Sequence, residues 1–211
     1  MADAEKFFDA IDAARVLRVK ELSEIKRTFA APSPADPFSI GSKAVVVLTY
    51  ANWEGFYNEC VRIYLDFLEE AGTKVADSGW LMLTGALSAD FDTLRSRNHS
   101  HEGRRDFVAQ LQTRLACGFE DFDRSVVMAR SNLDFARLSD NLTLLSFEFS
   151  ALQRSRIRLD KELVGWRHGV AHGDPPDLTA VSVSDHVDFA AGLMLALSDL
   201  FQNAILERLQ P

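Results

Sequence analysis

An arginine and two histidines stand close together in the stretch ELVGWRHGVAHGDPP, residues 162–176. Arg167 is followed directly by His168, and His172 comes four residues later, although the whole chain has only five histidines. Histidine exchanges protons near neutral pH, and the planar arginine side chain pairs well with phosphate oxygens. Together these side chains suit metal-independent cleavage of a phosphodiester, in which the 2′-hydroxyl of RNA attacks phosphorus.

Two further interpretations of the same residues stay open on the sequence alone. His168 and His172 have the i, i+4 spacing with which two imidazoles on one helix face can share a metal ion. A zinc-protease motif would need glutamate at position 169, where this chain has Gly169. The simplest interpretation is that the arginine and the histidines only cap and solvate a helix end.

The chain around these residues is predicted to form the last turns of a helix. Apolar spacing places the helix at about residues 159–171, and Gly173 with the prolines behind it ends the helix. On a continuous helix, Arg167 and His172 would point about 140° apart. We therefore expect the helix end to let His172 turn into the same cleft as Arg167. One histidine per chain is half of an acid–base pair, which a symmetric dimer would complete.

Basic residues cluster directly before this helix and in one other place. The first cluster consists of Arg154, Arg156, Arg158 and Lys161. The second is RSRNHSHEGRR, residues 95–105, in a region from 78 to 105 that has no clean helical period. Either cluster alone is typical of a solvated helix face or an exposed loop.

The rest of the chain has the apolar periodicity of an all-α protein. The clearest helices are predicted at residues 3–28, 39–71 and 185–208. The stripe of the second helix consists of Val46, Tyr50, Trp53, Tyr57, Val61, Tyr64 and Leu68. We expect one domain over residues 1–211, made of an N-terminal helix (1–30), a Pro-rich connection (31–39) and a bundle (40–211). The fold class is then an antiparallel helical bundle with a long central helix and an N-terminal helical extension.

Composition bounds the classes of protein to which this chain can belong. A hydrophobic fraction of 47% and a charged fraction of 26% are ordinary for a folded domain. The formal charge of −8 argues against a protein that coats nucleic acid with its whole surface. Two cysteines make neither a disulfide framework nor a zinc quartet, and no membrane span or signal peptide is expected. The expected location is the cytoplasm.

The motif LVGWRHGVAHG resembles the signature of the HEPN superfamily (higher eukaryotes and prokaryotes nucleotide-binding domains), which comprises small α-helical bundles. The family pattern is an arginine, commonly a polar residue, and then a histidine after four to six intervening residues. Arg167, His168 and His172 match this pattern. His168 stands at the position where the motif of the bacterial branch usually has asparagine.

Two upstream segments strengthen this resemblance. Tyr50 and the Trp53-Glu54-Gly55 triplet are similar to a tyrosine and a Trp-Glu-Gly in the long helix of the MAE-like bacterial branch. The segment RSNLDFARLSDNL, residues 130–142, resembles the one that precedes the active-site helix in that branch. The three pieces together span about residues 45–173.

The resemblance implies an HEPN-like helical bundle and a metal-independent endoribonuclease without a cofactor, acting at a homodimer interface and leaving a 2′,3′-cyclic phosphate and a 5′-hydroxyl. It implies Arg167 and His172 as the catalytic pair and His168 as an assisting residue. Two interpretations of Glu54 stay open: an acid that orients the arginine or the histidine, or an exposed position beside Trp53. The cluster of Arg154, Arg156, Arg158 and Lys161 then becomes an RNA-binding rim. Expected partners are RNA, a second copy of the chain and a cognate antitoxin, in a toxin–antitoxin or phage-defence setting. The alternative is a non-catalytic domain that binds nucleotide, RNA or a partner protein.

Overall fold

The computed structural model describes residues 3–29, 40–130, 132–174 and 182–209. Within these ranges the backbone forms helices and turns, with one isolated β-bridge between Lys74 and Gly118. The all-α prediction is therefore confirmed. The predicted Pro-rich connection, residues 31–39, lies outside the described residues.

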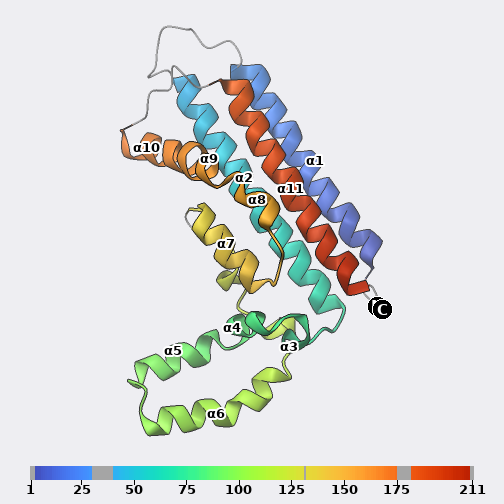
Figure 1. The fold of residues 1–211 in the computed structure, drawn as a ribbon, viewed down its shortest axis with the longest axis vertical. Coiled ribbons are helices and arrows are strands. Elements are labelled where there is room, and N and C mark those ends of the chain that lie inside the picture. The colour runs from blue at the N-terminus through green and yellow to red at the C-terminus, as the bar shows by residue number, and fades with distance from the viewer. Residues whose placement is uncertain (1–2, 30–39, 131, 175–181, 210–211) are drawn as a thin grey trace.

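Three long helices pack side by side and form the main body of the fold (Figure 1). They are α1 (Ala4–Phe29), α2 (Ile40–Glu70) and α11 (Val183–Leu209). Helix α1 runs antiparallel to the other two, whereas α2 and α11 run in the same direction, because the chain between them returns to its starting end. The helix predicted as an N-terminal extension thus packs against both α2 and α11, and it buries Phe7, Ile11, Leu22 and Ile25 there.

Helix α2 is the centre of the hydrophobic core. All seven residues of its predicted apolar stripe are buried. Val45, Phe56, Cys60 and Leu65 are buried as well, since α2 is covered from several sides. Burial raises the pKa of the Cys60 thiol, which leaves it a small apolar side chain without nucleophilic character.

Helix α11 is the second core helix, with ten buried residues. By length and composition it is the one described helix that could cross a membrane. Of its most apolar 18-residue stretch, 39% is buried inside the fold. Because α11 packs along α1 and α2, its apolar residues have a partner within the chain. The same composition occurs in core helices, so it is weak support for a membrane span.

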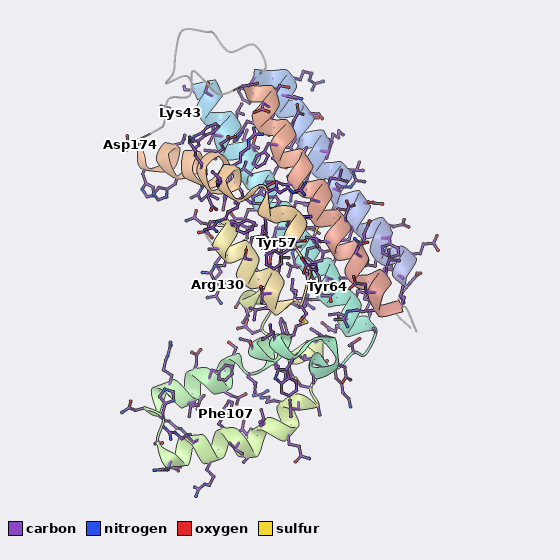
Figure 2. All side chains as sticks on the ribbon, viewed as in Figure 1. Lys43, Tyr57, Tyr64, Phe107, Arg130 and Asp174 are labelled. Atoms are coloured by element: carbon purple, nitrogen blue, oxygen red, sulfur yellow. The ribbon has the colours of Figure 1, made fainter. Side chains whose placement is uncertain are left out.

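The chain between α2 and α11 forms short helices on one side of α2 (Figure 1). In chain order they are α3 (Val75–Ser78), η1 (Trp80–Met82), α4 (Leu83–Ala86), α5 (Ser88–Ser96), α6 (His101–Leu115), η2 (Phe119–Asp121), η3 (Arg124–Val126), α7 (Phe135–Leu144), α8 (Ser150–Gln153), α9 (Arg156–Arg158), η4 (Leu159–Gly165) and α10 (Trp166–His172). Tyr57 and Tyr64 of α2, labelled in Figure 2, lie beneath this layer and are fully buried. Helices α5 and α6 project away from the body as a hairpin.

Candidate active site

Helix α10 carries the Arg–His motif and is preceded by a π-helix, η4. π-Helical turns are rare, and they occur often at functional sites. The Asp160 carboxylate in this turn accepts the backbone N–H of Phe135 at 2.7 Å, at the start of α7. A Cβ at Gly165, where η4 meets α10, would lie 3.1 Å from the Asp160 carbonyl oxygen. The π-turn is thus tied to α7 and leaves little room at its junction with α10.

Arg167 is half-buried and points toward α2. Its Nη1 donates a hydrogen bond to the Asn132 Oδ1 at 3.1 Å. Its Cζ lies 5.2 Å from the centre of the Tyr50 ring, within the range of a cation–π contact. The guanidinium is therefore held by one hydrogen bond and one aromatic face, and an arginine fixed in this way loses less entropy when it binds a phosphate.

Tyr50 connects Arg167 to Glu54, for which an orienting role is one of the two interpretations. The Tyr50 hydroxyl accepts the backbone N–H of Leu133 at 2.8 Å. Burial, followed by a side-chain hydrogen bond to Glu54, raises the pKa of this hydroxyl well above its usual range. Glu54 is hydrogen-bonded to Tyr50, and Arg167 lies over the ring of Tyr50. Glu54 is therefore linked to Arg167 through Tyr50.

His168 and His172 lie against each other on the exposed face of α10. Their ring centres are 4.2 Å apart and their ring planes are inclined by 49°. The helix ends directly after His172, because Gly173 adopts a φ of +80° and the N–H of Asp174 reaches back to the Gly169 carbonyl at 2.9 Å. This is a Schellman end, in which glycine avoids the cost of a left-handed residue. The predicted helix end is confirmed, and Asp174 marks it in Figure 2.

The structure gives Arg167 and His172 different neighbours within one chain. The backbone stays helical up to His172, so the angle of about 140° expected for this spacing holds. Arg167 faces Asn132 and Tyr50, while His172 faces His168 and solvent. The helix end on its own does not turn His172 toward Arg167. A phosphate held by both residues must therefore lie at the edge of α10 or between two chains.

The described part of the chain gives the histidine pair no third metal ligand. Among the described residues, no group of three or more His, Cys, Asp or Glu side chains is placed to hold a metal ion. His168 and His172 therefore offer two donors, one fewer than the protein ligands of a catalytic zinc site.

Three of the four cations in the predicted RNA-binding rim gather around one hollow. Arg154, Arg156 and Lys161 line an open depression of about 650 Å³ on α8, α9 and η4. The Arg156 Cζ also lies 5.9 Å from the centre of the Phe135 ring. The hollow therefore presents positive charge to solvent, just before the motif helix.

Arg158 is engaged differently from the other rim residues. It pairs with Glu162 at 2.7 Å and with the Asp185 carboxylate, and its Cζ lies 4.2 Å from the centre of the Phe189 ring. Burial lowers the pKa of this guanidinium, but the hydrogen bonds to Glu162 and Asp185 outweigh burial and raise it overall. Arg158 thus joins the turn before α10 to the start of α11.

Sequence reasoning missed the residues that hold the motif helix in place. Asn132, the partner of Arg167, lies in the segment that resembles the family, but nothing in the segment singles it out. Trp166 stacks on the buried His186 of α11, with ring centres 5.3 Å apart. Burial, helped by the nearby positive charge of Arg158, lowers the pKa of His186 to about 4. A single histidine in a helix carries no sequence signal for such a role.

One known protein family matches most of the chain. The family model described as RiboL-PSP-HEPN matches residues 14–203, which includes most of α1, all of α2 and α10, and most of α11. No curated protein and no solved structure matches the chain.

Proposed function

Since the chain belongs to the RiboL-PSP-HEPN family, we propose that it is a metal-independent endoribonuclease whose catalytic residues are Arg167 and His172. The observation that carries the proposal is the pairing of a guanidinium held by Asn132 and Tyr50 with an exposed imidazole at the end of the same helix. A fixed cation and a free proton carrier are what cleavage by the 2′-hydroxyl requires.

The proposed reaction transfers two protons, forms the bond from phosphorus to the 2′-oxygen and breaks the bond from phosphorus to the 5′-oxygen. A neutral His172 takes the proton of the ribose 2′-hydroxyl, and the 2′-oxygen attacks phosphorus. Arg167 stabilises the charge that grows on the phosphoryl oxygens. A protonated histidine then gives its proton to the departing 5′-oxygen, which leaves a 2′,3′-cyclic phosphate and a 5′-hydroxyl. His168, whose ring lies against that of His172, assists by limiting the orientations of His172.

A homodimer would supply the two histidines that this reaction needs. An apolar surface suited to such contact lies on α2 at the same end as α10. Ile40, Val47 and Leu48 are exposed there by 85%, 38% and 41%, and they recur at helical spacing. Contiguous exposed apolar residues can form interaction surfaces, so this face of α2 is the contact proposed between two copies. Two copies that meet there would bring their α10 helices close together.

The rim of Arg154, Arg156 and Lys161 would hold the RNA backbone next to the motif helix. Arg158 belongs to the same rim, although Glu162 and Asp185 neutralise much of its charge. The expected biological setting is a toxin–antitoxin or phage-defence system with a cognate antitoxin, in keeping with the likeness of Tyr50 and Trp53-Glu54-Gly55 to the MAE-like branch.

One observation favours the second candidate, a non-catalytic domain that binds nucleotide, RNA or a partner protein. Arg167 and His172 have different neighbours within one chain, so a monomer holds an incomplete site. Such a chain could bind a phosphate at Arg167 without cleaving it.

An RNA cleavage assay in the presence of EDTA tests the proposal. The wild-type protein is expected to cut RNA with EDTA present, and Arg167→Ala and His172→Ala are each expected to lower the rate by about 10²-fold or more. Arg27→Ala, an exposed arginine of α1, serves as the control and should cleave as the wild type does. Equal cleavage by all four proteins would indicate a contaminating nuclease and reject the proposal. Loss of wild-type activity in EDTA would instead favour a metal held by His168 and His172.

A further inference from the structure

The hairpin of α5 and α6 is built as an arm that contributes little to the core. Helix α5 has no buried residue, and Gly103 is the single buried residue of α6. The two helices are held together by the stacked rings of Phe91 and Phe107, whose centres are 5.6 Å apart. Phe107 is labelled on the inner side of the hairpin in Figure 2. The arm therefore contributes little apolar burial to the stability of the fold.

A tight turn at residues 97–99 closes the end of the arm. Asn98 and His99 both adopt positive φ angles, of 48° and 54°, and so reverse the chain within a few residues. The Ser100 hydroxyl then accepts the N–H of Gly103 and begins α6. The second basic cluster of the sequence, residues 95–105, is therefore the tip of a helical hairpin, made of the end of α5, an exposed turn and the start of α6.

The tip is positively charged in a chain that is negative overall. Residues 95–105 hold four arginines and one glutamate, against a formal charge of −8 for the whole chain. Arg95 and Arg97 pair with Asp92 and Asp106. Arg104 and Arg105 are exposed, and in the described part of the chain neither is paired with a carboxylate. These two guanidiniums are therefore available to an anionic partner.

The arm and the motif helix lie on the same side of α2, away from α1 (Figure 1). Helix α10 contacts the part of α2 around Tyr50. The arm begins with α5, after the short helices that follow the end of α2 at Glu70. Twenty residues of helix correspond to a separation of about 30 Å along α2. A polyanion that is held at the rim before α10 and continues along this side would reach the arm.

We propose that the tip of the α5–α6 arm, through Arg104 and Arg105, is a second binding site for the RNA backbone that engages only substrates long enough to reach it from α10. The proposal rests on the proposed function, because it takes RNA to be the substrate. The arm would then favour long RNA, because only a long RNA reaches both sites. It would not distinguish sequences, because it contacts phosphates and no bases.

The experiment compares a long and a short RNA on the full-length chain. A tetranucleotide places its phosphates over about 10 Å and cannot span the two sites, whereas an RNA of about 30 nucleotides can. Arg104→Glu/Arg105→Glu is expected to weaken binding of the long RNA at least about tenfold at ~50 mM salt. It should also lower the slope of log K against log salt by about 1 to 1.5. Cleavage of the tetranucleotide should stay unchanged.

Binding is measured by fluorescence anisotropy with 2′-O-methyl RNA, which lacks the attacking hydroxyl and stays intact. The matched control is Lys20→Glu/Arg27→Glu, which makes the same charge change at exposed positions of α1. Arg104→Gln/Arg105→Gln removes the charges without adding new repulsion and should show a smaller loss in the same direction.

Each outcome has a separate meaning. If the arm variant and the α1 control weaken long-RNA binding equally, the effect is one of net charge and the arm proposal is rejected. If the arm variant lowers binding of the long and the short RNA alike, the length dependence is wrong. Equal binding of DNA of the same length would retain a backbone-binding arm but reject its assignment to RNA. If the wild type neither binds nor cleaves RNA, the proposed function itself fails.

Discussion

Arg167 shows how a charged side chain is prepared for chemistry without being buried completely. Asn132 fixes one edge of its guanidinium and Tyr50 covers one face, so the remaining N–H groups keep a defined direction. His172 contrasts with it, since it lies at an exposed helix end with another histidine as its neighbour. In the proposed reaction, the held guanidinium would stabilise the growing charge and the exposed imidazole would carry the proton.

His186 is the residue that most directly links pH to the stability of the site. Its side chain is buried, and neither of its ring nitrogens has a hydrogen-bond partner among the described residues. Burial lowers its pKa to about 4, from an ordinary value of 6.5. Between these two values the unfolded chain takes up a proton that the folded chain cannot, so stability falls as the pH drops through this window. Below about pH 4 the loss levels off.

We therefore predict that acidification from pH 7 to about 4 costs up to about 3 kcal/mol through His186 alone. His186→Phe keeps a ring against Trp166 and should lose correspondingly less over the same range. Urea unfolding of both proteins at several pH values measures the difference, in which the carboxylates common to both cancel. The same pH dependence in both proteins would show that His186 is not the cause.

At the scale of elements, the end of α10 depends on one backbone conformation. Gly173 takes the left-handed φ of +80° that closes the Schellman end, although none of the described residues places an atom within 4 Å of an added Cβ. Gly192, in the middle of α11, also has open space around it but has no positive φ. Alanine substitutions at Gly173 and Gly192 therefore distinguish the free-energy cost of a left-handed backbone from the effect of adding a methyl group.

Gly173→Ala is expected to destabilise the protein by about 1 kcal/mol, because alanine pays for the left-handed conformation. Gly192→Ala is expected to stabilise it by up to about 1 kcal/mol, because alanine favours a helix interior. Gly173→Asn should fall between Gly173→Ala and the wild type, since asparagine tolerates this region. Thermal or urea unfolding gives the three values, and a stabilised Gly173→Ala would contradict the assigned helix end.

At the scale of the whole molecule, the three long helices form a frame and the short helices carry the proposed catalytic residues. Helix α10 rests on α2 near Tyr50, and the arm begins at the other end of α2. The exposed apolar residues of α2 lie at the end where α10 is found. A contact between two copies at that end would join two histidines and leave both arms free.

Mixing wild-type protein with His172→Ala tests whether a site needs both copies. If each active dimer needs two histidines, an equal mixture after subunit exchange should retain about a quarter of the wild-type activity, and not half. The assay is run at constant total protein, with Arg27→Ala mixed in place of His172→Ala as the control, and the control mixture should retain full activity. A linear fall to one half would indicate that each chain acts alone.

The helices, their apolar faces and the motif could be predicted from the sequence because all three depend on neighbours along the chain. The stripe on α2, the buried face of α11 and the end at Gly173 follow from periodicity and from the preference of glycine for a left-handed residue. The basic cluster at residues 95–105 has no clean apolar period, so the sequence left a solvated helix face and an exposed loop open; the structure has exposed helix ends on both sides of an exposed turn at residues 97–100.

Only the tertiary structure decided which side chains meet. The contacts of Arg167 with Asn132 and Tyr50 and the stacking of Trp166 on His186 join residues far apart in the chain. The tertiary structure also places Arg158 in ion pairs and leaves Arg104 and Arg105 exposed. All three are arginines in basic clusters, so the sequence alone does not distinguish them. The type of a residue determines which chemistry it can perform, but burial and partners are set by packing between distant segments. Local spacing carries no record of that packing.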